Sequence, residues 1–141
     1  MPQFRESIDI GRPPEAVWQA IGTPERWFEG YLESRSRSAD YPGPDTGDDH
    51  LYRTRTTEAV DARVTRSEAP TMLEEDQDGK TFSRRVRYSL TPIPTGTSLR
   101  VEDDVSFKGL GKLAAPIASR DIKKRWETSL AKLKEVAESG L

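Results

Sequence analysis

The chain lacks cysteine altogether and has a single histidine, His50. Without cysteine it can form no disulfide, no thiolate nucleophile and no cysteine-ligated zinc or iron–sulfur centre. A zinc site would need several nitrogen or sulfur ligands, and one imidazole cannot supply them. The acidic run Asp45, Asp48 and Asp49 lacks the spacing and the closing glutamate of a calcium loop. We therefore expect no metal and no cofactor, and we interpret His50 as a solvated loop residue.

Apolar residues are also scarce, and they form no long run. Hydrophobic residues make up 33% of the chain, no more than the charged residues. No segment approaches the roughly 20 consecutive apolar residues of a transmembrane helix. The first residues carry no basic region followed by an apolar stretch, as a secretory signal would. These absences predict a cytoplasmic protein that does not insert into membranes.

The chain also lacks a large excess of either positive or negative charge. The 22 basic and 24 acidic residues give a formal net charge of −2, whereas a nucleic-acid-binding domain is usually basic on one face. Arginine recurs on the predicted strands with glutamate interspersed, so we expect a mixed, solvated outer face and no nucleic-acid partner. The residues concerned are Arg35, Arg37, Arg53, Arg55, Arg63, Arg85, Arg87 and Arg100, with Glu33, Glu58, Glu74 and Glu102.

The length of 141 residues fits one domain spanning residues 1–141. A chain of this size buries roughly two thirds of its unfolded surface. With so few apolar residues, its core must be economical or partly replaced by a cavity. Nothing in the sequence sets the oligomeric state, and a monomer is the starting expectation.

The N-terminal region predicts one strand followed by two short helices. Apolar and polar residues alternate over residues 4–10, as in a half-buried strand. Proline suits the first turn of a helix, which favours a helix over 14–21 and a second one beginning at Pro24. Three aromatic residues of this second helix form either a lid over an interior space or a plug that holds the helices down. They are Trp27, Phe28 and Tyr31.

The middle of the chain reads as strands joined by turns. Asp78-Gly79 is the strongest hairpin signal in the chain. Clean alternation over 81–91 and 97–107 predicts two long strands with one apolar face. Shorter strands are expected at 32–38, 50–58, 62–68 and 71–76, with a loop rich in proline and aspartate at 39–49.

A long helix is expected from about Lys112 to Glu138, with Pro116 bending it or loosening its start. Its apolar residues form one stripe, and a meandering antiparallel sheet needs one face covered. The order of elements predicts an α+β fold: a curved antiparallel sheet of about six or seven strands around a long C-terminal helix, with two short helices after the first strand. The stripe consists of Ile122, Trp126, Leu130, Leu133 and Ala137.

Two separated strings carry a family resemblance. One is Ser7-Ile8-Asp9-Ile10, then Pro13-Pro14-Glu15-Ala16-Val17-Trp18, then Thr23-Pro24-Glu25-Arg26-Trp27; the other is Leu90-Thr91-Pro92, then Gly96-Thr97-Ser98-Leu99, leading into the final helix. Together they resemble the START-like, or SRPBCC, superfamily with its helix-grip fold, and within it the polyketide cyclase/dehydrase and lipid-transport family. The resemblance covers nearly the whole chain.

The resemblance implies a cavity between the sheet and the C-terminal helix. We expect it to bind a hydrophobic small molecule, either lipid-like or an aromatic molecule of the polyketide type. The apolar and aromatic residues expected to line or border this cavity are Val17, Ile21, Trp27, Phe28, Phe82, Tyr88, Leu99, Val101, Ile117 and Trp126.

The last hairpin offers polar groups for the same site. If Leu90 pairs with Leu99, then Arg84 and Asp103 lie diagonally on the inward face, within reach of each other. In a packed core, burying two charges can cost more free energy than their attraction returns. In a cavity, the same pair would anchor a ligand carboxylate, hydroxyl or ketone. The alternative is a slipped register, or a place for both groups at the solvent-exposed strand end.

Two other functions stay open at this point. In a polyketide aromatase/cyclase or dehydratase, Arg84, Asp103 and Tyr88 would position and polarise a ketone, although no catalytic residue can be named. In an interaction module like the co-chaperones of this superfamily, which activate a heat-shock ATPase, no cavity would be needed. The sequence shows no strong exposed apolar stripe that would require such a role.

Overall fold

A computed structural model describes residues 3–36, 44–54, 58–113 and 115–139. The strands within these ranges are β1 (Gln3–Ile10), β2 (Tyr31–Ser36), β3 (Asp49–Arg53), β4 (Ala59–Glu68), β5 (Met72–Gly79), β6 (Phe82–Ile93) and β7 (Gly96–Phe107). The helices are α1 (Pro14–Ile21), α2 (Pro24–Trp27), the 3₁₀ helix η1 (Gly109–Lys112) and α3 (Ala115–Glu138).

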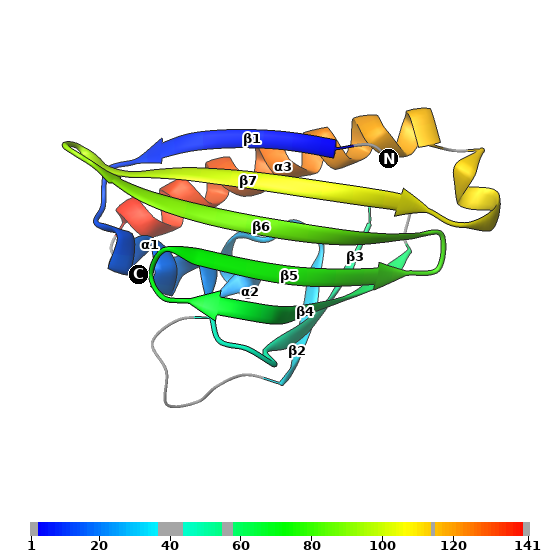
Figure 1. The fold of residues 1–141 in the computed structure, drawn as a ribbon, viewed down its shortest axis with the longest axis horizontal. Coiled ribbons are helices and arrows are strands. Elements are labelled where there is room, and N and C mark those ends of the chain that lie inside the picture. The colour runs from blue at the N-terminus through cyan, green and yellow to red at the C-terminus, as the bar shows by residue number, and fades with distance from the viewer. Residues whose placement is uncertain (1–2, 37–43, 55–57, 114, 140–141) are drawn as a thin grey trace.

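The seven strands form one antiparallel sheet in the order β1-β7-β6-β5-β4-β3-β2. Strand β1 pairs with β7, so the first and the last strand of the chain lie side by side at one edge of the sheet. Helix α3 runs along one face of the sheet, with α1 and α2 near its C-terminal part (Figure 1). The predicted α+β helix-grip architecture is therefore confirmed.

The long β6–β7 hairpin has the predicted register. Leu90 lies opposite Leu99, Val86 opposite Asp103, and Arg84 opposite Val105. Because side chains alternate along a strand, this register places the charged pair on the face that α3 covers.

Helix α3 begins at Ala115, three residues later than expected. Residues 109–112 form the separate 3₁₀ helix η1. Pro116 lies in the first turn of α3, where its missing N–H has no partner to lose, so it marks the start of the helix. The five residues of the predicted apolar stripe are all buried, and this part of the prediction is confirmed.

Several boundaries in the first half of the sheet differ from the prediction. The second helix ends at Trp27, so Tyr31 opens β2. Strand β4 begins at Ala59 and takes in residues that alternation alone did not reach. Parts of the strands predicted at 32–38 and 50–58, and of the loop at 39–49, lie outside the described residues, as do Arg37 and Arg55.

Strand β2 forms the second edge of the sheet, beyond β3. Five of its six residues are exposed. Its pairing with β3 is interrupted twice, between Tyr31 and Glu33 and again between Ser34 and Ser36. Neither face of β2 is apolar, and this strand adds little to the core.

Large side chains fill the centre of the space between the sheet and α3. The largest fully buried ones come from eight different elements, and dense packing of this kind leaves few voids. Among the described residues, the middle of the fold is therefore densely packed. These side chains are Trp126, Tyr52, Tyr88, Ile10, Leu73, Leu99, Leu133, Gln77, Val17, Val60, Val86 and Val101.

The outer face of the sheet carries both signs of charge, as predicted. Glu74 accepts a hydrogen bond of 2.7 Å from Arg87 and lies 3.8 Å from Arg66. Arg85 pairs with Asp76 at 3.0 Å. The Arg85–Asp76 pair is exposed, and such pairs contribute at most about 1 kcal/mol each, so it serves solubility more than stability.

One pair of like charges interrupts this pattern. Asp49 of β3 and Asp61 of β4 are diagonal neighbours, because Asp49 lies opposite Arg63 and Asp61 opposite Leu51. Within the described residues neither carboxyl Oδ1 receives a hydrogen bond from an N–H or a hydroxyl. Burial, followed by the hydrogen bond and charge of Asp61, raises the pKa of Asp49 from 3.8 to about 6, although Arg35 and Arg63 lower it. Two such carboxyls hold a shared proton more tightly than either would alone.

We predict that Asp49→Asn stabilises the protein at neutral pH. Because the folded-state pKa lies above the unfolded one, wild-type stability is full below about pH 4 and falls as the pH rises through 6. Urea unfolding at pH 4 and pH 7.5 should show the variant gaining stability over wild type only at the higher pH. Asp9→Asn, at an exposed carboxylate on β1, is the control. A gain that is equal at both pH values would contradict the shared proton.

A candidate ligand pocket beside a buried arginine

A cavity of about 260 Å³ lies where the N-terminal half of α3 leaves the sheet. Its walls come from α3, η1, the ends of β6 and β7, and the residues that flank the β3–β4 connection. Typical small-molecule pockets enclose about 300 to 1,000 Å³, so this cavity suits a compact molecule. Its lining consists of Thr54, Glu58, Thr81, Phe82, Arg84, Phe107, Leu110, Gly111, Ile117, Ala118, Asp121, Ile122 and Arg125.

The apolar part of the wall is built by three elements. Phe82 and Phe107 lie opposite each other near the end of the β6–β7 hairpin, and Ile122 faces them from α3. A Cβ on Gly111 would lie 2.3 Å from the Thr81 carbonyl oxygen. Glycine at this position therefore lets η1 close one side of the cavity.

Arg84, which is only 4% exposed, is one of several polar residues in the wall, together with Glu58, Asp121 and Arg125. Its Nη2 donates to Asp103 Oδ2 at 2.5 Å, and its Nε lies 3.2 and 3.1 Å from the two carboxylate oxygens. Burial would lower the pKa of Arg84, but the charge of Asp103 raises it above its ordinary value. The guanidinium therefore stays charged at every relevant pH.

A chain of hydrogen bonds extends from this ion pair into the core. Arg84 Nη1 donates to the Tyr52 hydroxyl at 2.8 Å, and that hydroxyl donates to Gln77 Oε1 at 2.6 Å. Trp126 Nε1 donates to Asp103 Oδ2 at 2.7 Å. Burial raises the pKa of Tyr52 to about 12, against the opposing charge of Arg84. Tyr52 is therefore a neutral phenol that both accepts and donates.

Arg84 keeps hydrogen-bonding capacity for a ligand. A guanidinium has five N–H donors, and the bonds to Asp103 and Tyr52 use three of them. Its central carbon lies 5.8 Å from the Phe82 ring centre and 5.7 Å from that of Trp126. The arginine is thus held between two aromatic rings, at the wall of the cavity.

The predicted site residues fall into three groups. Arg84, Phe82 and Ile117 line the cavity, and Asp103 lies directly behind Arg84. A second group belongs to the packed core and reaches no cavity: Val17, Leu99, Val101 and Trp126. A third group borders a separate hollow of about 30 Å³, space for about two water molecules: Ile21, Trp27, Phe28 and Tyr88.

Trp27, the last residue of α2, and Phe28, which follows it, form a plug. Trp27 and Phe28 are 4% and 5% exposed. The Phe28 ring lies 4.9 Å from that of Tyr52 and 6.2 Å from that of Trp126. Trp27 meets Tyr88 edge-on at 6.4 Å. Together these rings separate the small hollow from the cavity beside Arg84.

His50 is buried, contrary to the expectation of a solvated loop residue. It is 8% exposed and lies on β3, on the face that α3 covers. Its ring lies 5.4 Å from that of Phe28, so it extends the aromatic plug. Alternation along β3 places it beside Tyr52 on the same face, a signal that the acidic residues before it obscured.

Ten of the thirteen lining residues were not predicted as part of the site, among them Phe107, Leu110, Ile122 and Arg125. Phe107 belongs to the alternating pattern of its strand and Ile122 to the apolar stripe of the long helix. Leu110 belongs to no periodic pattern, so the sequence gives no sign that it faces a cavity. Arg125 is 4% exposed, although it lies among charged helix residues. It donates to the backbone carbonyls of Glu29 and Arg53, and this clamp has no signature in the sequence.

The clamp depends on a glycine. Gly30 has φ of 84°, and a Cβ there would lie 2.1 Å from the Arg53 carbonyl oxygen and 2.9 Å from Arg125 Nη1. Any larger residue would push the chain after α2 away from α3.

Within the described ranges, no three acidic or histidine side chains gather in a way that could hold a metal ion.

Solved structures of similar fold cover nearly the whole chain. A protein from Chromobacterium violaceum, CV1439, matches with a TM-score of 0.74 at 16% identity over 96% of each chain. MLL2253 from Mesorhizobium loti matches with a TM-score of 0.72 at 21% identity over 99% of each. A START superfamily protein from Mycobacterium smegmatis matches with a TM-score of 0.73 at 15% identity over 97% of each. At these identities the likeness concerns the fold. A search of curated proteins finds no match.

The fold and the cavity beside its long helix define a START-like, helix-grip protein. The family model described as polyketide cyclase/dehydrase and lipid transport matches residues 1–138. The chain belongs to this family. None of its described helices combines the length and apolar character that crossing a bilayer requires.

We predict that Arg84 and Asp103 depend strongly on each other. Either Arg84→Met or Asp103→Leu strands one buried charge and should cost about 3–5 kcal/mol of unfolding free energy. The double variant strands no charge, so its loss should be clearly smaller than the sum of the two single losses. Urea unfolding of the four proteins measures this coupling, and additive losses would refute it.

Proposed function

We propose that this protein binds a small, largely apolar molecule in the cavity beside Arg84, with an oxygen atom of the ligand turned towards the guanidinium. The observation that carries the proposal is the combination of a largely apolar cavity wall with the buried, fixed guanidinium of Arg84, which has donors to spare. Pockets that bind small molecules are typically apolar with a few converging polar groups.

The charges around the cavity favour a neutral ligand. Asp103 compensates Arg84, while Arg125, Glu58 and Asp121 also line the wall. A carboxylate would add a further negative charge to a site in which three carboxylates already accompany two guanidiniums, and burying an uncompensated charge is costly. A carbonyl or hydroxyl oxygen avoids that cost. The ligand class is therefore a lipid-like or polyketide-like aromatic molecule of one or two rings with a ketone or hydroxyl group.

Binding without chemistry fits the geometry better than a cyclase or dehydratase reaction. Such a reaction would draw on Tyr88 together with Arg84 and Asp103, but Tyr88 borders the other hollow. Asp103 is occupied by Arg84 and by Trp126. Burial raises the pKa of Tyr88 well above its ordinary value, which makes it a poor proton donor. A co-chaperone role would leave the cavity without a purpose.

We predict that Ile122→Trp abolishes ligand binding by filling the cavity. Fluorescence titration with 1-N-phenylnaphthylamine should show an affinity at least about tenfold lower than in wild type, since an indole would occupy the space of one aromatic ring. The control is Leu32→Trp, which places the same side chain at an exposed site on β2. Equal affinity in wild type and in a folded Ile122→Trp variant would overturn the proposal. Native mass spectrometry of freshly purified protein would identify a ligand carried through purification.

A second experiment tests the role of Arg84. In wild type, 2-acetylnaphthalene should bind several-fold tighter than naphthalene, because its ketone accepts a hydrogen bond from a charged donor. Arg84→Lys keeps the charge beside Asp103 but loses the planar set of donors, so the preference should largely disappear while naphthalene binding persists. A preference that survives the substitution would remove Arg84 from the site.

A further inference from the structure

The corner between η1 and α3 exposes large apolar side chains. Leu110 is 81% exposed, Leu113 82% and Ile117 65%. They are three of the four exposed large hydrophobic residues within the described ranges, the fourth being Leu32 on β2. We call these three residues the apolar corner. Contiguous exposed apolar groups of this kind mark interaction sites.

The segment that contains the apolar corner is basic in a chain that is otherwise acidic. Residues 108–124 contain five basic residues and one acidic residue, which leaves 17 basic and 23 acidic residues for the rest. One of the five, Lys108, pairs with Asp78 at 2.8 Å. The others are exposed and show no ion pair among the described residues: Lys112, Arg120, Lys123 and Lys124.

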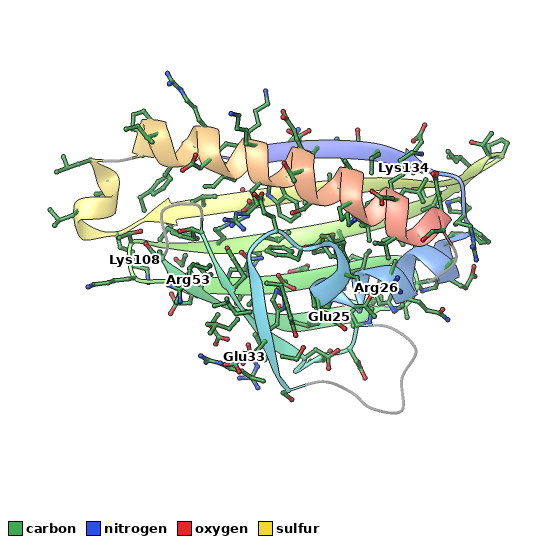
Figure 2. The ribbon with its side chains drawn as sticks, turned by 180° about the vertical axis from the view of Figure 1, so that it is seen from behind. Glu25, Arg26, Glu33, Arg53, Lys108 and Lys134 are labelled. Carbon is green, nitrogen blue, oxygen red and sulfur yellow. The ribbon has the colours of Figure 1, made fainter. Side chains whose placement is uncertain are left out.

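The apolar corner lies at an extremity of the molecule. Figure 1 shows η1 projecting beyond the ends of β6 and β7. Seen from the helix side, Lys108 lies at this end and Lys134 at the opposite one (Figure 2). The site is a protruding tip, whereas protein partners usually meet over broad, closely fitting surfaces. A tip with exposed leucines and with basic residues on the same two helices fits a soft, negatively charged surface.

We propose that the apolar corner docks onto anionic phospholipid membranes. Its leucines enter the boundary between headgroups and acyl chains, as the apolar faces of peripheral proteins do, and the surrounding basic side chains lie against lipid phosphates. The excess of acidic residues elsewhere is repelled by the same surface. The charge distribution therefore also orients the protein, with the apolar corner towards the membrane.

Docking would bring the cavity to the membrane. Leu110 and Ile117 belong both to the apolar corner and to the lining of the cavity. A ligand could pass between the lipid and the cavity without crossing bulk water. This transfer step rests on the proposed function, whereas docking itself needs no ligand and no open cavity.

Co-sedimentation with vesicles tests docking directly. Wild-type protein should bind vesicles of phosphatidylcholine with 30% phosphatidylglycerol, bind little to pure phosphatidylcholine, and release as salt screens the charges. Both Leu110→Ser/Leu113→Ser and Lys112→Glu/Lys123→Glu should lower the bound-to-free ratio at least about tenfold. The controls are Leu32→Ser and, for the charge reversal, Arg26→Glu/Arg100→Glu at exposed positions away from the corner.

The outcomes separate docking from ligand binding. Absence of binding to anionic vesicles, or equal binding by the corner variants, would overturn docking whatever the cavity does. Ile122→Trp should still bind vesicles, so loss of probe binding with intact docking would count against the cavity alone. If light scattering of lipid-free protein showed a dimer that Leu110→Ser/Leu113→Ser dissolves, the apolar corner would be a contact with a second copy and the membrane proposal would be wrong.

Discussion

The buried pair of Arg84 and Asp103 is the interaction on which the interior depends. It joins two neighbouring strands, and its hydrogen bonds reach Tyr52 on β3 and Trp126 on α3. Removing either charge would leave the other buried and unpaired, which is among the costliest single defects in a protein. The pair thus fixes the sheet against the helix and, at the same time, holds one cation at the cavity wall.

Alternation and helical periodicity were enough to predict most of the fold. The pairing of Leu90 with Leu99 fixed the place of Arg84 and Asp103, because one register determines every partner along a hairpin. The predicted boundaries were wrong where polar residues lie on both faces of a strand, as in β2. They were also wrong where a single residue sets the start of an element, as Pro116 does in the first turn of α3. His50 was missed because neighbouring aspartates masked the alternation of β3.

The site was predicted less well, because a cavity depends on which side chains fail to meet. Sequence patterns identify apolar residues that face inward but do not tell whether others fill the space in front of them. Leu99 and Val101 were expected at a cavity and are fully packed, while Ile122, in the same helical stripe as Trp126, borders open space. Arg125 acts through backbone carbonyls, which any sequence provides.

The irregular edge strand β2 has a consequence for association between molecules. An open sheet edge offers unpaired backbone groups to a strand from another copy, and natural sheets guard against this with charged residues and bulges. In β2 the pairing with β3 is broken twice, and the strand carries the exposed charged residues Glu33 and Arg35. A foreign strand would find no continuous ladder to extend. The molecule can therefore expose a seven-stranded sheet without inviting runaway polymerisation through that edge.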